Sequence, residues 1–385
     1  MIVLEVYVLR LVTLFIVTFC LVVPVAQGKD WSKPKALKQN REPVGIISLS
    51  GVNDLNCKLA AQQISPFRYF TYPPNDYTEF TPNREFETMN LVRSMQAVIV
   101  QTLNSEMRND EKLKSWVSKF VGALKKGNYS KTRHTGAWER FDHGKAGVPD
   151  PNYGANIAIL TASYLVSIID ELDLWAGDQR ETIIAWGNKL VPITQKHPKG
   201  FSLKQQGRDN VALMSATYIA WGLVAGSQQA IDYGVKAFDI VLAEIGTDGA
   251  YEFFQTTAKS RSHNNQFLRE DDKTIGLLVN AAHLGRIAGL QLYKKRNKRG
   301  KTIHDAIDWL MLAHFEPEKT KNAEFLVNQQ RIGSGLVNYH WGWTAIYAND
   351  FPDEPLSKKS DELKPYGGWY HRESMGPTSC LFDRR

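Results

Sequence analysis

Apolar residues recur at three- and four-residue spacing through most of the chain after Glu85, a pattern typical of amphipathic α-helices. Two helices are predicted first, one from Glu85 through Leu103 and one around Leu113 to Leu124. Further helices are predicted at about 154–176, 178–195, 209–225, 228–245, 272–290 and 301–315. Tight turns such as Gly177-Asp178 and Gly226-Ser227 join them, so successive helices should form antiparallel hairpins.

Several hairpins in sequence build either a solenoid or a closed α/α toroid, and the lack of a fixed-period repeat favours the toroid. We therefore predict an all-α domain over residues 85–385, an incomplete barrel of antiparallel helix hairpins. Residues 29–84 are polar, irregular and rich in proline, and should form an extended arm on the domain surface. The tail from Gly333 to Arg385 should consist of loops and short strands that close one end.

The first 28 residues differ in composition from the rest. Arg10 precedes an apolar run from Leu11 to Ala26, and Ala26-Gln27-Gly28 has the small-x-small pattern of a signal peptidase site. We interpret residues 1–28 as a removed export signal, which predicts a secreted or periplasmic protein. A single membrane anchor is the alternative, but the run is shorter than the ~20 residues that a span requires. We expect no stable membrane insertion after signal removal.

The cysteines bear on the cellular compartment, and the net charge bears on the kind of binding partner. Removal of the signal would leave Cys57 and Cys380 near opposite ends of the chain, as a disulfide or as two free thiols. No cysteine pattern suits a metal.

The formal charge of +7 favours an anionic partner. Because an exported protein rarely meets nucleic acid, we expect an anionic polysaccharide and no nucleic acid; the oligomeric state stays open.

Two polar clusters interrupt the apolar pattern between Gly200 and Asn265. Arg208-Asp209-Asn210 opens one predicted helix, and Arg261-Ser262-His263-Asn264-Asn265 precedes another. Polar groups at the starts of helices are what a cleft for an anionic sugar polymer needs. We predict that both clusters face one cleft, floored by the helix starts after Arg208 and near Asp271.

The order of several motifs carries a family resemblance. They are Gln179-Arg180-Glu181-(x)4-Trp186, Arg208-Asp209-Asn210, Asp232-Tyr233-Gly234-Val235, Asp248-Gly249, Ser262-His263-Asn264-Asn265 and Gly300-(x)3-His304. Through them the chain, from about Cys57 to Phe382, resembles the alginate lyases of polysaccharide lyase family 5. The resemblance implies an α/α toroid that cleaves polyuronates by β-elimination without a cofactor.

Two departures from the family pattern affect the catalytic residues. Where the family has Asn-Asn-His, this chain has Asp209-Asn210-Val211, so the histidine is replaced by an aliphatic residue. The family's catalytic tyrosine aligns best with Asn264. Either other residues have taken these roles, the register is shifted, or the enzyme is altered or inactive.

β-Elimination needs donors that neutralise the uronate carboxylate, a base for the C5 proton and an acid for the glycosidic oxygen. We assign the donor role to Asn210 and Arg261 and the base role to His263, since an unperturbed histidine pKa of about 6.5 suits proton transfer near neutral pH. Tyr339 or Tyr129 would donate the proton. Substrate binding is assigned to Arg208, Tyr129, Asn264, His340 and Trp341.

Structural alternatives stay open for several of these residues. Asn210 could cap its helix, and Tyr339-His340-Trp341 could belong to a core aromatic cluster. Tyr129 matches a lid tyrosine of the family, and the glycine-rich loop that contains it, Lys125 to Pro151, is either a lid or an irregular segment. The basic run from Lys294 to Arg299 is a solvated loop or the extension of a polyanion track.

The leading hypothesis is an exported polyuronate lyase acting on alginate or a related uronic-acid polymer. A non-catalytic polyuronate-binding or export-associated protein on the same fold is the main alternative, because the family's histidine and tyrosine are replaced. A glycoside hydrolase is a third hypothesis and would need two opposed carboxylates. No such pair stands out among Glu252, Asp271 and Asp272.

Overall fold

The computed structural model describes residues 36–47, 49, 52, 57, 84–126, 151–195, 201, 203, 207–251, 267–321, 341–358 and 378–382. All of them belong to one compact unit, Lys35–Arg385. Within these residues the regular structure is helical, apart from one isolated antiparallel bridge between Ile245 and Tyr251. The predicted signal 1–28, most of the arm 29–84 and most of the loop from Lys125 to Pro151 lie outside the described residues.

The helices follow the predicted order, with ends that differ by a few residues. They are α3 (Arg84–Leu103), α4 (Asp110–Lys125), α5 (Pro151–Leu172), α6 (Gln179–Gln195), α8 (Arg208–Val224), α9 (Gln228–Leu242), α11 (Phe267–Ile287), α12 (Ile303–Phe315), α14 (Trp343–Asp350) and α16 (Thr378–Phe382), with the 3-10 segments η3 (Leu292–Lys294) and η4 (Pro317–Lys319). The prediction of an all-α chain built from sequential helices is confirmed for the described residues.

The prediction of loops and short strands for the tail is wrong where the tail is described. Residues 341–358 and 378–382 contain α14 and α16 and no strand. The side chains from Trp343 to Ala348 are all buried, and α14 packs against both α11 and α16. This packing outweighs the preference of Trp, Ile and Tyr for strands, because tertiary contacts override weak local propensities.

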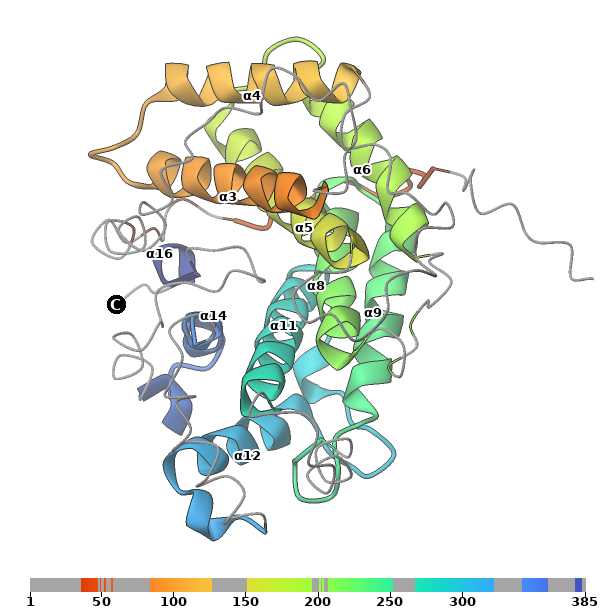
Figure 1. Cartoon of the computed structure of the whole chain (residues 1–385), viewed down its shortest axis with the longest axis vertical. Helices are drawn as coiled ribbons and strands as arrows, with labels where there is room; N and C mark the ends of the chain where they lie inside the picture. The colour runs from red at the N-terminus through yellow and green to blue at the C-terminus, as the bar shows by residue number, and fades with distance from the viewer. Residues whose placement is uncertain are drawn as a thin grey trace, which may run out of the picture. The chain divides into compact units, whose positions relative to one another are not determined.

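Five helices, α3, α5, α8, α11 and α14, form an inner layer in which each contacts the next (Figure 1). In α8 every side chain from Val211 to Val224 is buried. Tyr164, in the middle of α5, donates a hydrogen bond to Asn280, in the middle of α11, at 2.7 Å. Arg208 and Asp271 pair near the starts of α8 and α11. Lys273 of α11 also lies over the ring of Tyr153 at the start of α5, so the amino-terminal ends of α5, α8 and α11 lie at the same end of the layer.

The helices α4, α6, α9 and α12 alternate along the chain with the inner ones, and α9 shows how they pack. Its buried residues occupy one face, against α8. Gly222 of α8 lies against Ile231 of α9, and Gly234 of α9 lies against Ile219 of α8. Because the residue numbers run in opposite directions across this contact, α8 and α9 are antiparallel, which confirms the predicted hairpin (Figure 1).

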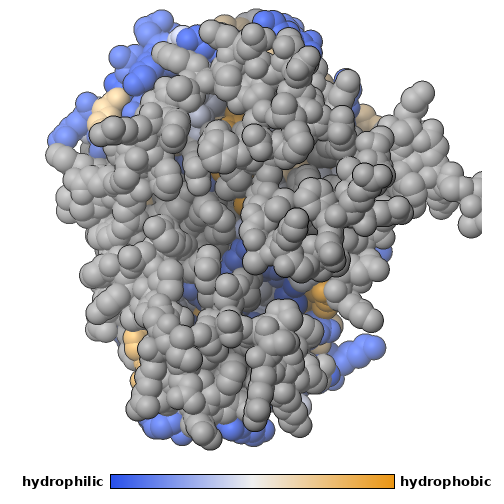
Figure 2. Space-filling model, in the orientation of Figure 1, coloured by the Kyte–Doolittle hydropathy of each residue, from blue (hydrophilic) through white to orange (hydrophobic). Residues whose placement is uncertain are grey.

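Apolar side chains are concentrated in the interior. Among the described residues, only Met107 and Phe315 are large hydrophobic residues that are clearly exposed. Figure 2 accordingly shows mostly hydrophilic colour where described residues reach the surface of this face. Within the described residues, α5 is long and apolar enough to cross a membrane, but its segment Tyr153–Leu172 is mostly buried inside the domain, as in a core helix.

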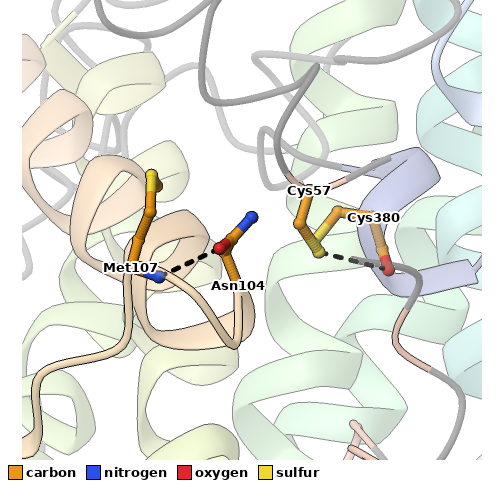
Figure 3. Close-up of a disulfide and its surroundings, with 4 residues drawn as sticks. All are labelled: Cys57, Asn104, Met107 and Cys380. Carbon is orange, nitrogen blue, oxygen red and sulfur yellow. Dashed lines mark hydrogen bonds between the residues drawn. A yellow bond between two sulfur atoms is a disulfide. The ribbon is translucent and has the colours of Figure 1, made fainter. Parts of the chain in front are cut away.

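Cys57 and Cys380 form a disulfide, so the first of the two alternatives for these cysteines is confirmed (Figure 3). The two residues are 323 positions apart in sequence, and both are buried. The bond ties the segment near Cys57 to α16. Nearby, Asn104 accepts a hydrogen bond from the backbone N–H of Met107 just after α3 ends (Figure 3). Disulfides persist mainly in oxidising compartments, so the pairing agrees with the predicted export.

Glycine at position 234 permits the close approach of α8 and α9. A β-carbon there would lie 2.8 Å from the carbonyl oxygen of Ser215 and 2.6 Å from Cγ1 of Ile219. We predict that Gly234→Ala lowers the free energy of unfolding by about 1–3 kcal/mol, because the new atom forces the helices apart. Chemical denaturation of the variant and the wild type measures this loss.

Gly122→Ala in α4 is the matched control, since a β-carbon there would meet nothing within 4 Å. Alanine is favoured over glycine inside a helix by about 1 kcal/mol, so this variant should keep or raise the stability. Equal stability of the two variants would contradict the close packing of α8 and α9.

Candidate functional site

Polar and aromatic side chains gather where the inner helices begin. We call this group the amino-terminal cluster; it joins residues from the starts of α5, α8, α11 and α14 with one residue from the bridge after α9. Its members are Tyr153, Arg208, Asp209, Asn210, Tyr251, Asp271, Asp272, Lys273 and Trp343. The ion pair between Arg208 and Asp271 brings together the two helix starts that were predicted to floor one cleft, and the cleft itself stays a prediction.

The Arg208–Asp271 pair is buried. Nη2 of Arg208 lies 2.9 Å from Oδ1 of Asp271, and the two side chains are 9% and 0% exposed. The guanidinium carbon also lies over the ring of Tyr251, 4.4 Å from its centroid. Burial raises the pKa of Asp271 to about 6, against the lowering effect of Arg208. The sequence prediction gave Arg208 a substrate carboxylate as its partner, whereas in the structure its partner is this internal carboxylate.

Tyr251 completes the buried side of the pair. Its ring is fully buried, and its hydroxyl has no hydrogen-bond partner among the described residues. Burial raises the pKa of the phenol well above its usual range, so the side chain stays neutral at physiological pH. Tyr251 therefore holds the guanidinium by ring contact and not by charge.

Gly207 fixes where α8 begins. It is the residue before the helix and has a φ of 83°, in the region that favours glycine. The alternative in which Asn210 caps the helix is therefore wrong, because Asn210 is already the third residue of α8. Its half-buried side chain lies in the first helical turn, where the backbone N–H groups carry partial positive charge.

A second ion pair links three of the inner helices. Lys273 Nζ lies 2.6 Å from Oδ2 of Asp209, and the same ammonium lies over the ring of Tyr153, 4.4 Å from its centroid. These contacts join the starts of α11, α8 and α5. The first turns of the helices are thereby held in fixed register, as a preorganised site requires.

The carboxylates of this cluster do not form the pair that a glycoside hydrolase needs. Asp271 is bound to Arg208, and Asp272 accepts a hydrogen bond from Nε1 of Trp343 at 2.8 Å. Both acids are buried, so neither is open to a sugar in this structure. Glu252, the third acid considered from the sequence, lies outside the described residues.

Trp341 belongs to a buried aromatic group and not to an open surface. Its side chain is 1% exposed, and its ring stacks on Trp343 at 6.2 Å and meets His314 edge-on at 4.8 Å. This geometry favours the core-cluster alternative over a sugar platform, because a stacking sugar needs a free ring face. Burial lowers the pKa of His314 to about 4, so its imidazole is neutral.

The other predicted site residues lie outside the described residues. They are His263, Arg261, Asn264, Tyr129, Tyr339 and His340. Their roles stay predictions. The described residues contain no group of three or more His, Cys, Asp and Glu suited to a metal ion.

Sequence reasoning missed four members of the cluster: Tyr153, Tyr251, Lys273 and Trp343. One signal for them was present, namely the adjacent acids Asp271 and Asp272 near a helix start, which need partners when buried. The partners come from α8 and α14, and no sequence spacing identifies them.

Solved structures with a similar fold define the class of this protein. Alginate lyase A1-III from Sphingomonas species A1 shares 12% identity with a TM-score of 0.55 over 92% of this chain and 88% of that chain. A histidine-to-alanine variant of alginate lyase A1-III, complexed with a tetrasaccharide, shares 13% identity with a TM-score of 0.55 over 88% and 94% of the two chains. The chain is an α/α toroid, the fold class predicted from its helix hairpins.

A family model described as alginate lyase matches residues 69–320, more than half of the chain. The chain therefore belongs to the alginate lyase family, and the family and the fold make it a polysaccharide lyase. No curated protein matches the sequence significantly.

The buried ion pair predicts a specific pH dependence of stability. Arg208 lowers the pKa of Asp271, so Arg208→Gln should raise that pKa above its present value of about 6. A carboxyl group whose folded pKa exceeds its unfolded value adds most stability at low pH and loses it as pH rises through the folded pKa. The melting temperature of Arg208→Gln should therefore fall more at pH 8 than at pH 5, with a cost of about 3–5 kcal/mol at the higher pH.

The double variant Arg208→Gln/Asp271→Asn is the control, because it removes the titrating group and should remove the added pH dependence. Lys125→Gln, which breaks the exposed pair with Asp178, should have little effect at either pH. A pH profile of Arg208→Gln parallel to that of the wild type would contradict the coupling between Arg208 and Asp271.

Proposed function

We propose that this polysaccharide lyase is exported and cleaves alginate or a related polyuronate by β-elimination, with its reaction site at the amino-terminal cluster. The position of Asn210 carries the proposal. This residue lies half-buried in the first turn of α8, two residues after the Arg208 that is locked to Asp271. Its amide can donate to a uronate carboxylate at the positive end of a buried helix.

The chemistry explains why such a position is suited to the reaction. Removal of the C5 proton places negative charge on the neighbouring carboxylate as an enolate forms. A fixed amide donor and a helix amino terminus stabilise that charge without rearrangement during the reaction. The ion pairs Arg208–Asp271 and Asp209–Lys273 hold the first turn of α8 in place against α11.

The remaining roles come from the sequence. His263 is proposed as the base, Arg261 as a second carboxylate donor, and Tyr339 or Tyr129 as the proton donor. Asn264, His340 and Tyr129 are proposed to bind the polymer. Arg208 is assigned to positioning, because its guanidinium is engaged by Asp271 and Tyr251.

Two observations support export. The apolar segment before Gly28 has the features of an export signal, and the Cys57–Cys380 disulfide suits an oxidising compartment. The polymer substrate is supported by the similar alginate lyase A1-III variant, which is complexed with a tetrasaccharide. We extend that binding of an oligosaccharide to uronate polymers in this chain.

One observation favours a second candidate function, a polyuronate-binding protein without catalysis. Val211 occupies the position at which the family carries its histidine, and it is fully buried in α8. No proton can be transferred there. Incubation of the purified protein with a panel of polyuronates decides between the two, because a lyase creates a conjugated double bond that absorbs ultraviolet light and a binding protein does not.

We predict that Asn210→Ala lowers kcat on the polyuronate that is cleaved by about 10²–10³-fold, the usual loss for one donor to a developing oxyanion. Gln229→Ala is the control, since this exposed amide lies in the first turn of the outer helix α9, which begins where α8 ends. It should leave kcat unchanged. Melting temperatures measured beside the rates separate lost catalysis from lost stability.

His263→Ala should depress turnover by about 10²–10⁴-fold while polymer binding is largely kept, as expected for removal of a general base. Near-full activity of this variant would show that His263 is not the base and would make Tyr339 or His340 the next residue to test.

A further inference from the structure

The segment from Lys294 to Lys301 contains six basic residues and no acidic one. It leaves η3 and runs to the start of α12. Sequence alone left two alternatives for most of this run, a solvated loop or part of a polyanion track. The structure describes the whole segment, so its anchoring and its exposed charges can be compared. We call it the basic loop.

Asn297 anchors the basic loop to the carboxyl-terminal end of α9. Its side-chain amide donates to the carbonyl oxygens of Leu242 and Ile245 at 3.0 and 2.8 Å. Its side-chain oxygen accepts from the backbone N–H groups of Arg299 and Lys301 at 2.8 and 3.0 Å. The loop is therefore a fixed turn built around one asparagine and not a freely solvated tail.

The charges of the loop divide into two groups. Lys295 pairs with Asp239, and Lys301 pairs with Asp305, while Arg299 donates to the carbonyl of Ala243. Lys294, Arg296 and Lys298 are exposed, and no carboxylate among the described residues pairs with them; Arg296 also donates to the backbone carbonyl of Gly300 within the loop. The anchoring of the loop thus accounts for the first group and leaves three cations facing solvent on a rigid turn.

A series of direct residue contacts links the basic loop to the amino-terminal cluster. Asn297 binds the carbonyl of Ile245, and Ile245 forms the bridge with Tyr251. Tyr251 lies under Arg208 at the start of α8. On the other side, Asp305, the partner of Lys301, has its backbone against Gly249. Arg296 and Lys298, the neighbours of Asn297 in sequence, therefore lie on the side of the domain where the inner helices begin, and Lys294 precedes them in the same loop.

We infer that Lys294, Arg296 and Lys298 form an outer binding surface for the polyuronate chain, which holds carboxylates of sugar units beyond those at the reaction site. The inference rests on the proposed function, because it assigns the surface to the same polymer. A long polyanion reaches both sites at once, so each raises the effective concentration of the chain at the other. A short oligomer that occupies only the reaction site gains nothing from the loop.

The test uses the full-length protein and its triple variant Lys294→Gln/Arg296→Gln/Lys298→Gln. Asn297 and Arg299 stay in place, so the hydrogen bonds that anchor the loop to the end of α9 are kept. The probes are high-molecular-mass sodium alginate and an alginate tetrasaccharide. Dissociation constants and kcat/KM are measured for both probes at low salt and at a roughly tenfold higher salt concentration, which shortens the screening length about threefold.

The variant should bind and cleave the polymer at least about tenfold less efficiently at low salt, and the difference should shrink at high salt as screening increases. Its kcat/KM on the tetrasaccharide should equal that of the wild type. The control Lys112→Gln/Lys119→Gln/Lys189→Gln removes three exposed charges from α4 and α6 and should keep wild-type values with both probes.

An equal loss in the control would show that only net charge matters and would overturn the inference. Unchanged polymer affinity in the loop variant would overturn it as well, while leaving the proposed function intact. A wild type that yields no ultraviolet-absorbing product would instead contradict the proposed lyase function, and polymer binding by the two variants would still decide the role of the loop.

Discussion

The inner helices are buried on nearly all sides, and this constraint determines where polar chemistry can lie. Along α8 every side chain from Val211 onward is buried, so charged side chains are confined to its first turn. There Arg208 forms an ion pair with Asp271, and Asp209 forms one with Lys273. A buried charge without a partner costs several kcal/mol, which makes the register of α8 against α11 dependent on these pairs. Parallel inner helices then place their positive ends together, and the region suited to an anionic substrate follows from the packing.

Within this short stretch of α8, one residue holds the helix in place and another is proposed to contact the substrate. Arg208 is engaged by a carboxylate and by the ring of Tyr251. Asn210, two residues later, is half-buried in the same helical turn. The next residue, Val211, which the sequence analysis aligns with the family's histidine, is fully buried. In the proposed lyase the base must therefore come from another part of the chain, and His263 is the residue that the sequence offers.

The helical part of the fold could be predicted because its signal is local. The turn of Gly226-Ser227 and the apolar spacing on either side place α8 and α9 nearly to the residue. The tail could not be predicted in this way, since α14 is a helix through its burial against α11 and α16 and not through the preferences of Trp343 or Tyr347. The disulfide also depended on the fold, because nothing local relates Cys57 to Cys380.

The candidate site was predictable only in outline, because helix starts are local features and their partners are not. Arg208 and Asp271 come together as expected, but the partner of Lys273 and the burial of Trp341 depend on three-dimensional packing. The most direct measurement is a crystal structure with a bound uronate oligomer. We predict a uronate carboxylate within about 2.7–3.2 Å of the Asn210 side-chain amide. An oligomer bound instead at the opposite ends of the inner helices, near Arg286 and Asp350, would contradict a reaction site at the amino-terminal cluster.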